Sequence, residues 1–152
     1  IFILIYSCDN NKKPEDLWDE AQNYRINNNL MEAINTFKNI IEIYPNNYLS
    51  SKSQFQIADI YLNDIKDYDL SIKEFKSVVK DYPNDEVAKK SLFMIAYIYN
   101  NYINAYTDAI DNYNLFISKY PKDELIPSVK YELEGLKEII SKIDSLKINN
   151  DL

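Results

Sequence analysis

The chain has 152 residues and a net charge of −7, with one glycine, five prolines, a single cysteine and no histidine. The acidic balance argues against nucleic acid as a partner, because phosphate backbones are bound by basic surfaces. Without histidine, glycine-rich loops or a second cysteine, the chain also lacks the usual residues of catalytic, cofactor and metal sites. We therefore expect a helical, non-catalytic protein with no cofactor, no metal and no small-molecule substrate.

The first eight residues, IFILIYSC, are mostly apolar and end abruptly at the polar run DNNKK. This segment is typical of the end of a signal peptide, and its last residues resemble the lipobox of bacterial lipoproteins. The resemblance implies that residues 1–8 are a truncated signal peptide, that Cys8 is lipidated, and that residues 9–13 form a short tether. The protein would then lie on the periplasmic side of a bacterial membrane, with the outer membrane as the expected location. A buried thiol and a reactive thiol stay open as alternatives for Cys8.

A Tyr-Pro dipeptide recurs at Tyr44-Pro45, Tyr82-Pro83 and Tyr120-Pro121, always 38 residues after the one before it. Proline cannot continue an α-helix, and it disfavours the α conformation in the residue before it, so each dipeptide marks the end of a helix. A fixed period of this length is typical of repeat proteins built from pairs of helices.

Each period also contains two pairs of residues in which a small side chain is followed by a ring three or four positions later. The small residue lets two helices approach closely, and the ring fills the space beside that contact. The pairs are Ala21/Tyr24, Ala33/Phe37, Ala58/Tyr61, Ser71/Phe75, Ala96/Tyr99 and Ala109/Tyr113.

The order and spacing of these positions resemble the tetratricopeptide repeat (TPR) over residues 14–121. The resemblance implies an all-α fold, namely a right-handed α-solenoid of three TPR-like helix hairpins with a C-terminal capping helix. The three hairpins are expected at residues 14–47, 48–85 and 86–123. The family's usual period is 34 residues. The alignment places about three extra residues at the start of each later first helix and one extra residue in the turn within the second and third hairpins.

A last helix is expected over residues 124–148. It carries Glu134 and Lys137 where the earlier first helices have alanine and tyrosine, so no partner helix should follow it. This helix is therefore expected to be a solvated cap, which a solenoid needs at its end. Residues 149–152 are expected to be a frayed tail.

In TPR arrays the first helix of each hairpin lines the concave face, so the resemblance predicts a surface there for protein or peptide partners. Aromatic anchors at Trp18, Phe55 and Phe93 suit such a role. The alternatives are that Phe55 and Phe93 pack against neighbouring helices and that Trp18 is a capping core residue. The predicted partner-binding residues are Trp18, Gln22, Arg25, Ile26, Phe55, Asp59, Leu62, Phe93, Tyr97, Asn100 and Asn101.

The lipobox-like start, the long period and the Tyr-Pro closures together resemble the BamD-like lipoproteins of the β-barrel assembly machinery. This resemblance implies a membrane-anchored scaffold that binds proteins during outer-membrane protein assembly. Two other functions stay open. One is a soluble periplasmic TPR module like the Tol-Pal-associated division coordinator, and the other is a structural spacer without a peptide groove.

Overall fold

The computed structural model describes residues 12–150, with side chains described as far as residue 146. Within this range the regular structure consists of helices, and no strand is present. None of the helices in this range is both long and apolar enough to cross a bilayer. The all-α prediction is therefore confirmed for the described residues, whereas the signal-peptide segment and the lipidation of Cys8 lie outside them.

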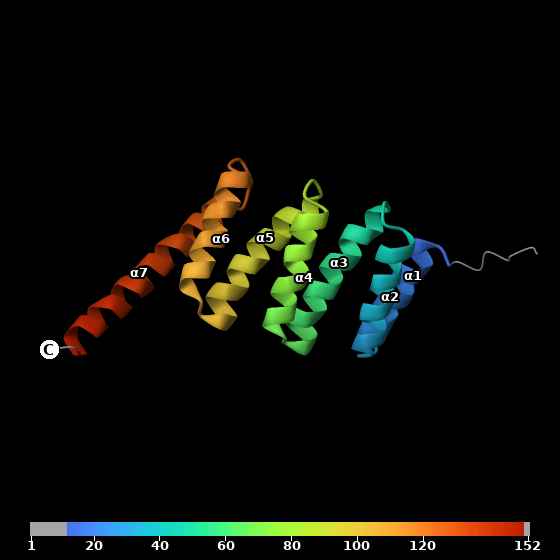
Figure 1. Cartoon of the computed structure of the whole chain (residues 1–152), viewed down its shortest axis with the longest axis horizontal. Helices are drawn as coiled ribbons and strands as arrows, with labels where there is room; N and C mark the ends of the chain where they lie inside the picture. The colour runs from blue at the N-terminus through green and yellow to red at the C-terminus, as the bar shows by residue number, and fades with distance from the viewer. Residues whose placement is uncertain (1–11, 151–152) are drawn as a thin grey trace, which may run out of the picture. The chain divides into compact units, whose positions relative to one another are not determined.

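Each predicted hairpin contains one pair of helices, and a longer helix follows the third pair (Figure 1). By contact, the chain forms two compact units, one ending at Ser53 and the other beginning at Gln54, and each is described by itself. The helices are α1 (Pro14–Ile26), α2 (Leu30–Ile43), α3 (Tyr48–Ile60), α4 (Tyr68–Asp81), α5 (Glu86–Ile98), α6 (Tyr106–Lys119) and α7 (Ile126–Asn150).

The three Tyr-Pro segments form the same turn. In each one, the tyrosine carbonyl accepts a hydrogen bond from the backbone N–H three residues later, at 2.9 to 3.0 Å. The side chain of that later residue then accepts a hydrogen bond from the backbone N–H two residues further on. Proline at the second position presets the turn, and the side-chain acceptor caps the next helix. The acceptors are Asn47, Asp85 and Asp123, at 2.9, 3.2 and 3.0 Å.

The turns within the hairpins differ by one residue, as the alignment predicts. In the first hairpin the Tyr24 carbonyl accepts from the N–H of Asn29, five residues later, at 2.8 Å. In the second, a π-helical turn at Tyr61–Ile65 lets the Tyr61 carbonyl accept from Asp67, six residues later, at 2.8 Å. The third hairpin repeats this π-helical turn at Tyr99–Ile103. A single inserted residue is the usual origin of a π-helical turn, so the extra residue is absorbed without breaking the helix.

The predicted extension of the later first helices is also confirmed. Helix α1 begins three residues before Leu17, whereas α3 begins six residues before Gln54 and α5 begins six residues before Leu92. Leu17, Gln54 and Leu92 occupy the same position of the repeat. The additional turn therefore lies at the helix start, directly after the capped Tyr-Pro segment.

The small residues of the repeat form the centre of the core, because all of them have a relative exposure of 0%. The rings on the second helices of the hairpins, Phe37, Phe75 and Tyr113, are equally buried. The rings on the first helices are only half-buried. Packing of small residues against rings thus holds each hairpin together. The buried small residues are Ala21, Ala33, Ala58, Ser71, Ala96 and Ala109.

Helix α7 packs against α6 and is almost twice as long, with 25 residues against 14. Its buried residues Val129, Leu133 and Leu136 belong to one cluster with Tyr113 and Phe116 of α6. The helix begins two residues later than predicted and continues to Asn150. The helix thus includes residues 149 and 150 of the predicted tail, and the fraying of these residues stays a prediction.

Candidate partner-binding site

The structure distributes the predicted partner-binding residues over both compact units. Trp18, Gln22, Arg25 and Ile26 lie on α1, in the unit that ends at Ser53. The remaining seven lie on α3, on α5 and in the two π-helical turns, in the unit that begins at Gln54. We therefore treat the two groups as separate surfaces.

Phe55 and Leu62 are corrections to the predicted surface, because both are in the core, with relative exposures of 7% and 4%. The Phe55 ring meets the Phe75 ring edge-on at 5.2 Å between centroids, and the ammonium group of Lys90 lies 4.8 Å from the Phe55 centroid. Helices α4 and α5 thus cover this position. The packing alternative stated for Phe55 is the one that the structure shows.

Phe93 also has a packing role. Its ring contacts Tyr113 and Phe116 of α6 at centroid distances of 5.9 and 6.3 Å. On its other side it stacks on Tyr97 at 6.3 Å, and Tyr97 meets Tyr102 edge-on at 6.0 Å. These rings form a ladder that runs from the buried core to the exposed Tyr102 in the third intra-hairpin turn.

The polar residues predicted beside the ladder make intramolecular hydrogen bonds. The side-chain amide of Asn100 donates to Glu132 of α7 at 2.9 Å, and that of Asn101 donates to the Tyr97 carbonyl at 3.0 Å. Asp59 accepts from the Asn63 amide at 2.9 Å. The groups on this second surface are therefore occupied in stabilising turns and helix contacts.

Trp18 has a different environment, because it borders a hollow of about 270 Å³. Its ring contacts Phe37 of α2 edge-on at 5.3 Å, which orients the indole, while part of the ring stays accessible to solvent. The other half of the hollow comes from the first turns of α3. Its lining consists of Glu15, Trp18 and Asp19 of α1 and Tyr48, Leu49 and Lys52 of α3.

The hollow has an apolar floor and a charged rim. Leu49 is only 4% exposed and forms the floor, whereas Tyr48 is 58% exposed. The Lys52 ammonium lies 5.0 Å from the centre of the Tyr48 ring, a cation–π arrangement that holds both side chains beside the opening. Glu15 and Asp19 supply negative charge on the α1 side. Such a site can take an apolar side chain whose neighbours are basic.

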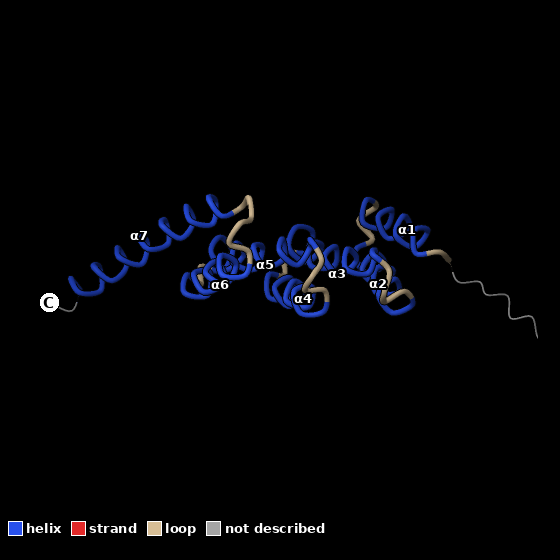
Figure 2. The backbone as a smooth tube through the Cα atoms, turned by 90° about the horizontal axis from the view of Figure 1, so that it is seen from above, coloured by secondary structure: helices blue, strands red, loops and turns tan. Residues whose placement is uncertain are grey.

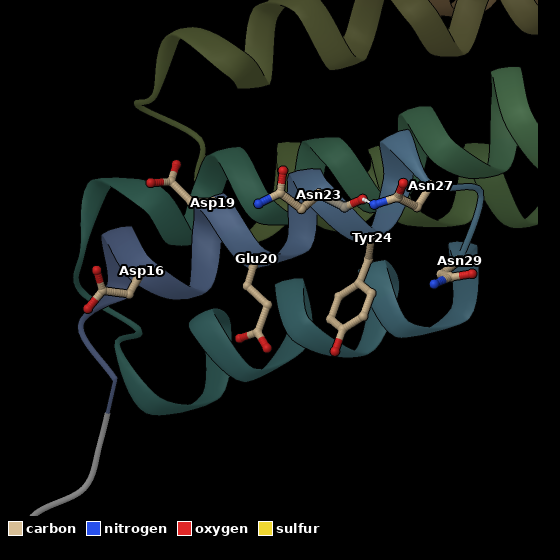
Figure 3. Close-up of a pocket in the computed structure, with 7 residues that line it drawn as sticks. All are labelled: Asp16, Asp19, Glu20, Asn23, Tyr24, Asn27 and Asn29. Atoms are coloured by element: carbon tan, nitrogen blue, oxygen red, sulfur yellow. Dashed lines mark hydrogen bonds between the residues drawn. The ribbon is translucent and has the colours of Figure 1, made fainter.

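A second hollow, of about 430 Å³, lies on another face of α1 (Figure 3). Asp19, Asn23 and Asn27 project from one side of the helix, and Glu20 and Tyr24 project from another. Glu20 pairs with Lys12 at 2.8 Å, which raises the pKa of Lys12 through a hydrogen bond and charge attraction. Within residues 12–150, no group of three or more acidic, cysteine or histidine side chains is placed to hold a metal ion. We interpret this polar face as solvated.

Tyr48, Leu49 and Lys52 were not among the predicted partner-binding residues. Tyr48 and Leu49 belong to the extra turn at the start of α3, which the repeat alignment located without a role, and Lys52 follows that turn. The Tyr-Pro turn at Tyr44 leads directly into this additional helical turn. Tyr48 therefore lines the same hollow as Trp18. The longer start of α3 could therefore have pointed to this site. The repeat pattern could not show that the start of α3 and Trp18 of α1 line one hollow.

Ile26 is the most exposed of the predicted residues on α1, at 79%, and it does not line the Trp18 hollow. Gln22 and Arg25 are partly exposed and also lie outside that lining. Of the predicted residues on α1, the structure therefore places Trp18 in a concave site.

Comparison with known proteins gives the fold and the family. No curated protein matches the chain. Among solved structures, it is similar to MamA, from residue 41 to the end, of Desulfovibrio magneticus RS-1, with a TM-score of 0.52 and 17% identity, covering 92% of this chain and 78% of that one. It is also similar to the C-terminal TPR-containing domain of a Plasmodium falciparum protein described as FK506-binding, with a TM-score of 0.53 and 19% identity, covering 87% and 91%.

At these identities the structural likeness shows the fold alone, and it confirms the predicted class, an all-α TPR-like solenoid. A sequence profile of the family described as soluble NSF attachment protein, SNAP, matches residues 4–135. This range covers most of the 152 residues, including every helix from α1 to α6. The chain therefore belongs to the soluble NSF attachment protein (SNAP) family.

Proposed function

We propose that this protein is a non-catalytic scaffold that binds a protein partner at the Trp18 hollow. The observation that carries the proposal is the indole itself, which is anchored on Phe37 and still accessible beside an apolar floor. Exposed aromatic anchors in pockets contribute most of the binding energy in many protein interfaces. The family is described as an attachment protein, and TPR-type folds generally bind proteins, so both support this class of function.

The charges around the hollow favour one kind of partner segment. Glu15 and Asp19 flank Trp18 on α1 and outnumber Lys52, the cation of the same lining, and the whole chain has a net charge of −7. A segment with one apolar side chain next to lysine or arginine would fill the hollow and meet these carboxylates. The apolar contact would supply affinity, and the charges would mainly supply specificity and association rate.

Site-specific photo-crosslinking tests the proposal. A p-benzoylphenylalanine side chain placed at position 48, at the rim, should capture a partner in cells that express the protein. The same probe at position 31 is the matched control, because Met31 is similarly exposed, at 57%, but lies on α2 outside the hollow. Equal capture from both positions would overturn the proposal.

Two substitutions then show whether capture depends on the hollow. Trp18→Ala should reduce the cross-link at least tenfold, and Trp18→Phe should retain part of it because a ring is kept. Since Trp18→Ala also removes the contact with Phe37, Asp19→Lys provides a variant that leaves this packing intact. Circular dichroism of each variant checks the fold. Undiminished capture by both Trp18→Ala and Asp19→Lys would reject the site, and the absence of any partner would favour a structural spacer.

More specifically, we propose that the protein is a lipoprotein of the bacterial cell envelope. This proposal is supported by the sequence before Cys8, and it places the protein on the periplasmic side of a bacterial membrane, with the outer membrane as the proposed location. Labelling with radioactive palmitate tests this step. Label in the wild type that is lost in Cys8→Ser supports the anchor, whereas unlabelled wild-type protein favours a soluble periplasmic module like the Tol-Pal-associated division coordinator.

The role in outer-membrane protein assembly is a separate step of the proposal, supported by the resemblance to BamD-like lipoproteins. Identification of the cross-linked partner decides it. Capture of the barrel-inserting subunit from position 48 would support the role. Capture of a different protein would keep the scaffold function and reject the assembly role.

A further inference from the structure

Helix α7 continues beyond the helix that covers its first half. Helix α6 has 14 residues and α7 has 25, and they run antiparallel from the turn after Tyr120. Val129, Leu133 and Leu136 are at most 7% exposed and pack in the cluster formed with α6. Figures 1 and 2 both show the last part of α7 extending past α6. At 1.5 Å per residue, the 14 residues after Leu136 add about 20 Å of helix.

The apolar stripe does not stop where α6 stops. Ile140 follows Leu136 after four residues and Ile143 follows after three more, which continues the spacing of Val129, Leu133 and Leu136. Alternation of three and four residues is the pattern of helices that pair with another helix. Two further apolar residues widen the stripe on one side. These are Ile139, at 37% exposed, and Leu146, at 62%.

The other side of the stripe carries opposite charges at the same heptad position. Lys137 and Asp144 are seven residues apart, and both border a shallow hollow together with Ile140. In an antiparallel pair of heptad helices, equivalent flanking positions of the two helices face each other. Lys137 of one helix would then face Asp144 of the other, and the reverse pair would form by symmetry.

The apolar positions match in the same alignment. When two such helices are antiparallel and centred between Ser141 and Lys142, Ile140 lies opposite Ile143 of the second copy. Ile139 lies opposite Leu146 in the same register, so apolar residues meet on one edge and opposite charges meet on the other. A parallel pair would instead place Ile139 beside Asp144. The face is therefore complementary to itself in one orientation, as a two-fold interface requires.

We propose that the C-terminal half of α7 is the interface of a homodimer, in which the α7 helices of two copies pair antiparallel over residues 137–146. In this arrangement the α6 helix of each copy covers the first half of its own α7, and the partner copy covers the second half. The contact is short, so we expect a dissociation constant on the order of 10 µM.

Sedimentation velocity of the whole chain between about 1 and 500 µM tests the dimer. Wild-type protein should convert from monomer to dimer across this range. Ile143→Glu should keep it monomeric throughout, since a carboxylate would be buried between the helices. Circular dichroism checks the fold of this variant, whose substituted side chain does not belong to the core cluster. Wild-type protein that stays monomeric at every concentration would overturn the proposal.

A charge exchange tests the antiparallel orientation. Lys137→Glu should weaken the dimer about fivefold or more, and the double variant Lys137→Glu/Asp144→Lys should restore it. Lys142→Glu is the matched control, because it makes the same charge change on the same helix from an exposed position outside the stripe. Equal weakening by Lys137→Glu and Lys142→Glu, or no recovery in the double variant, would overturn the proposed pairing.

Discussion

The hydroxyl group of Ser71 on α4 donates a hydrogen bond of 2.9 Å to the backbone carbonyl of Ala58 on α3. Both residues have a relative exposure of 0%, so the bond is buried where the two helices meet. The equivalent positions in the other hairpins are Ala33 and Ala109, which allow the same approach without a hydrogen bond. This hairpin is therefore held by a polar contact in addition to close packing.

Ser71→Ala should destabilise the protein by about 0.5–1.5 kcal/mol, because the hydrogen bond is lost while the space is kept. Ser71→Leu should cost more, about 3 kcal/mol, because the larger side chain forces α3 and α4 apart. Urea unfolding followed by circular dichroism measures both values. Equal costs for the two variants would contradict the close-approach interpretation.

Lys66 is in the left-handed conformation, with φ of 64°, at the end of the second intra-hairpin turn. Asparagine occupies the same conformation in the first and third hairpins, at Asn28 and Asn104. Because glycine avoids the clash of Cβ in this region, Lys66→Gly should stabilise the protein by about 0.5–1 kcal/mol. Lys66→Ala is the matched control, since it keeps Cβ and should change the free energy of unfolding very little. A stabilisation by alanine as large as that by glycine would point to the lysine charge instead.

Asp123 is the capping residue of the third Tyr-Pro turn, and its carboxylate also pairs with Lys89 at 3.0 Å. The hydrogen bond from the Leu125 N–H, and then the one from Lys89, lower the pKa of Asp123 below its ordinary value. A carboxyl group whose pKa is lower in the folded state stabilises the fold above its unfolded pKa of about 3.9, and this stabilisation is lost as the pH falls through the folded pKa.

Asp123→Asn should therefore make the free energy of unfolding depend less on pH under acidic conditions. The amide can still accept from Leu125, as Asn47 does from Leu49 in the first turn, but it cannot titrate or form the ion pair. The wild-type advantage should be present at pH 6 and should be lost as the pH falls through the folded pKa of Asp123. Urea unfolding across this pH range measures it. A difference between the two proteins that is independent of pH would contradict the assignment.

The Tyr113 side chain is fully buried at a position where the other hairpins have Phe37 and Phe75. Its hydroxyl has no partner at hydrogen-bonding geometry among the described residues, although the nearby Asn100 amide is close enough to affect its titration. Burial raises the pKa of Tyr113, with Glu132 as a second cause. Tyr113→Phe removes a buried polar group with little change in volume, so stability should rise by about 1 kcal/mol. Thermal unfolding tests this, and a lower melting temperature would show that the hydroxyl is hydrogen-bonded in solution.

Much of the fold could be predicted because the residues that define the repeat act on the conformation of the nearby backbone. Proline cannot be added to the interior of a helix, so it stops a helix that precedes it, and the three Tyr-Pro segments indeed form one turn geometry. The extra residue in two of the intra-hairpin turns was visible from spacing alone. The structure shows how it is absorbed, by π-helical turns that are followed by Lys66 and Asn104 in the left-handed conformation.

The candidate site was predicted less well, because accessibility depends on which helices cover a position. Trp18 and Phe55 occupy the same register of the repeat. In the structure Phe55 is buried beneath neighbouring helices, whereas Trp18 borders an open hollow. Register predicts which face of a helix a residue is on, but it does not predict what packs against that face.

By itself, the sequence determined the helical class, the closing turns and the buried small residues, because periodicity, proline and side-chain size act along the chain. Only the tertiary structure decided which apolar residues are left accessible. That outcome depends on which helices pack against each other in three dimensions, as Tyr48 of α3 does beside Trp18 of α1 and α6 does along the first half of α7. The two proposed interaction surfaces, the Trp18 hollow and the C-terminal half of α7, both lie where this covering is incomplete.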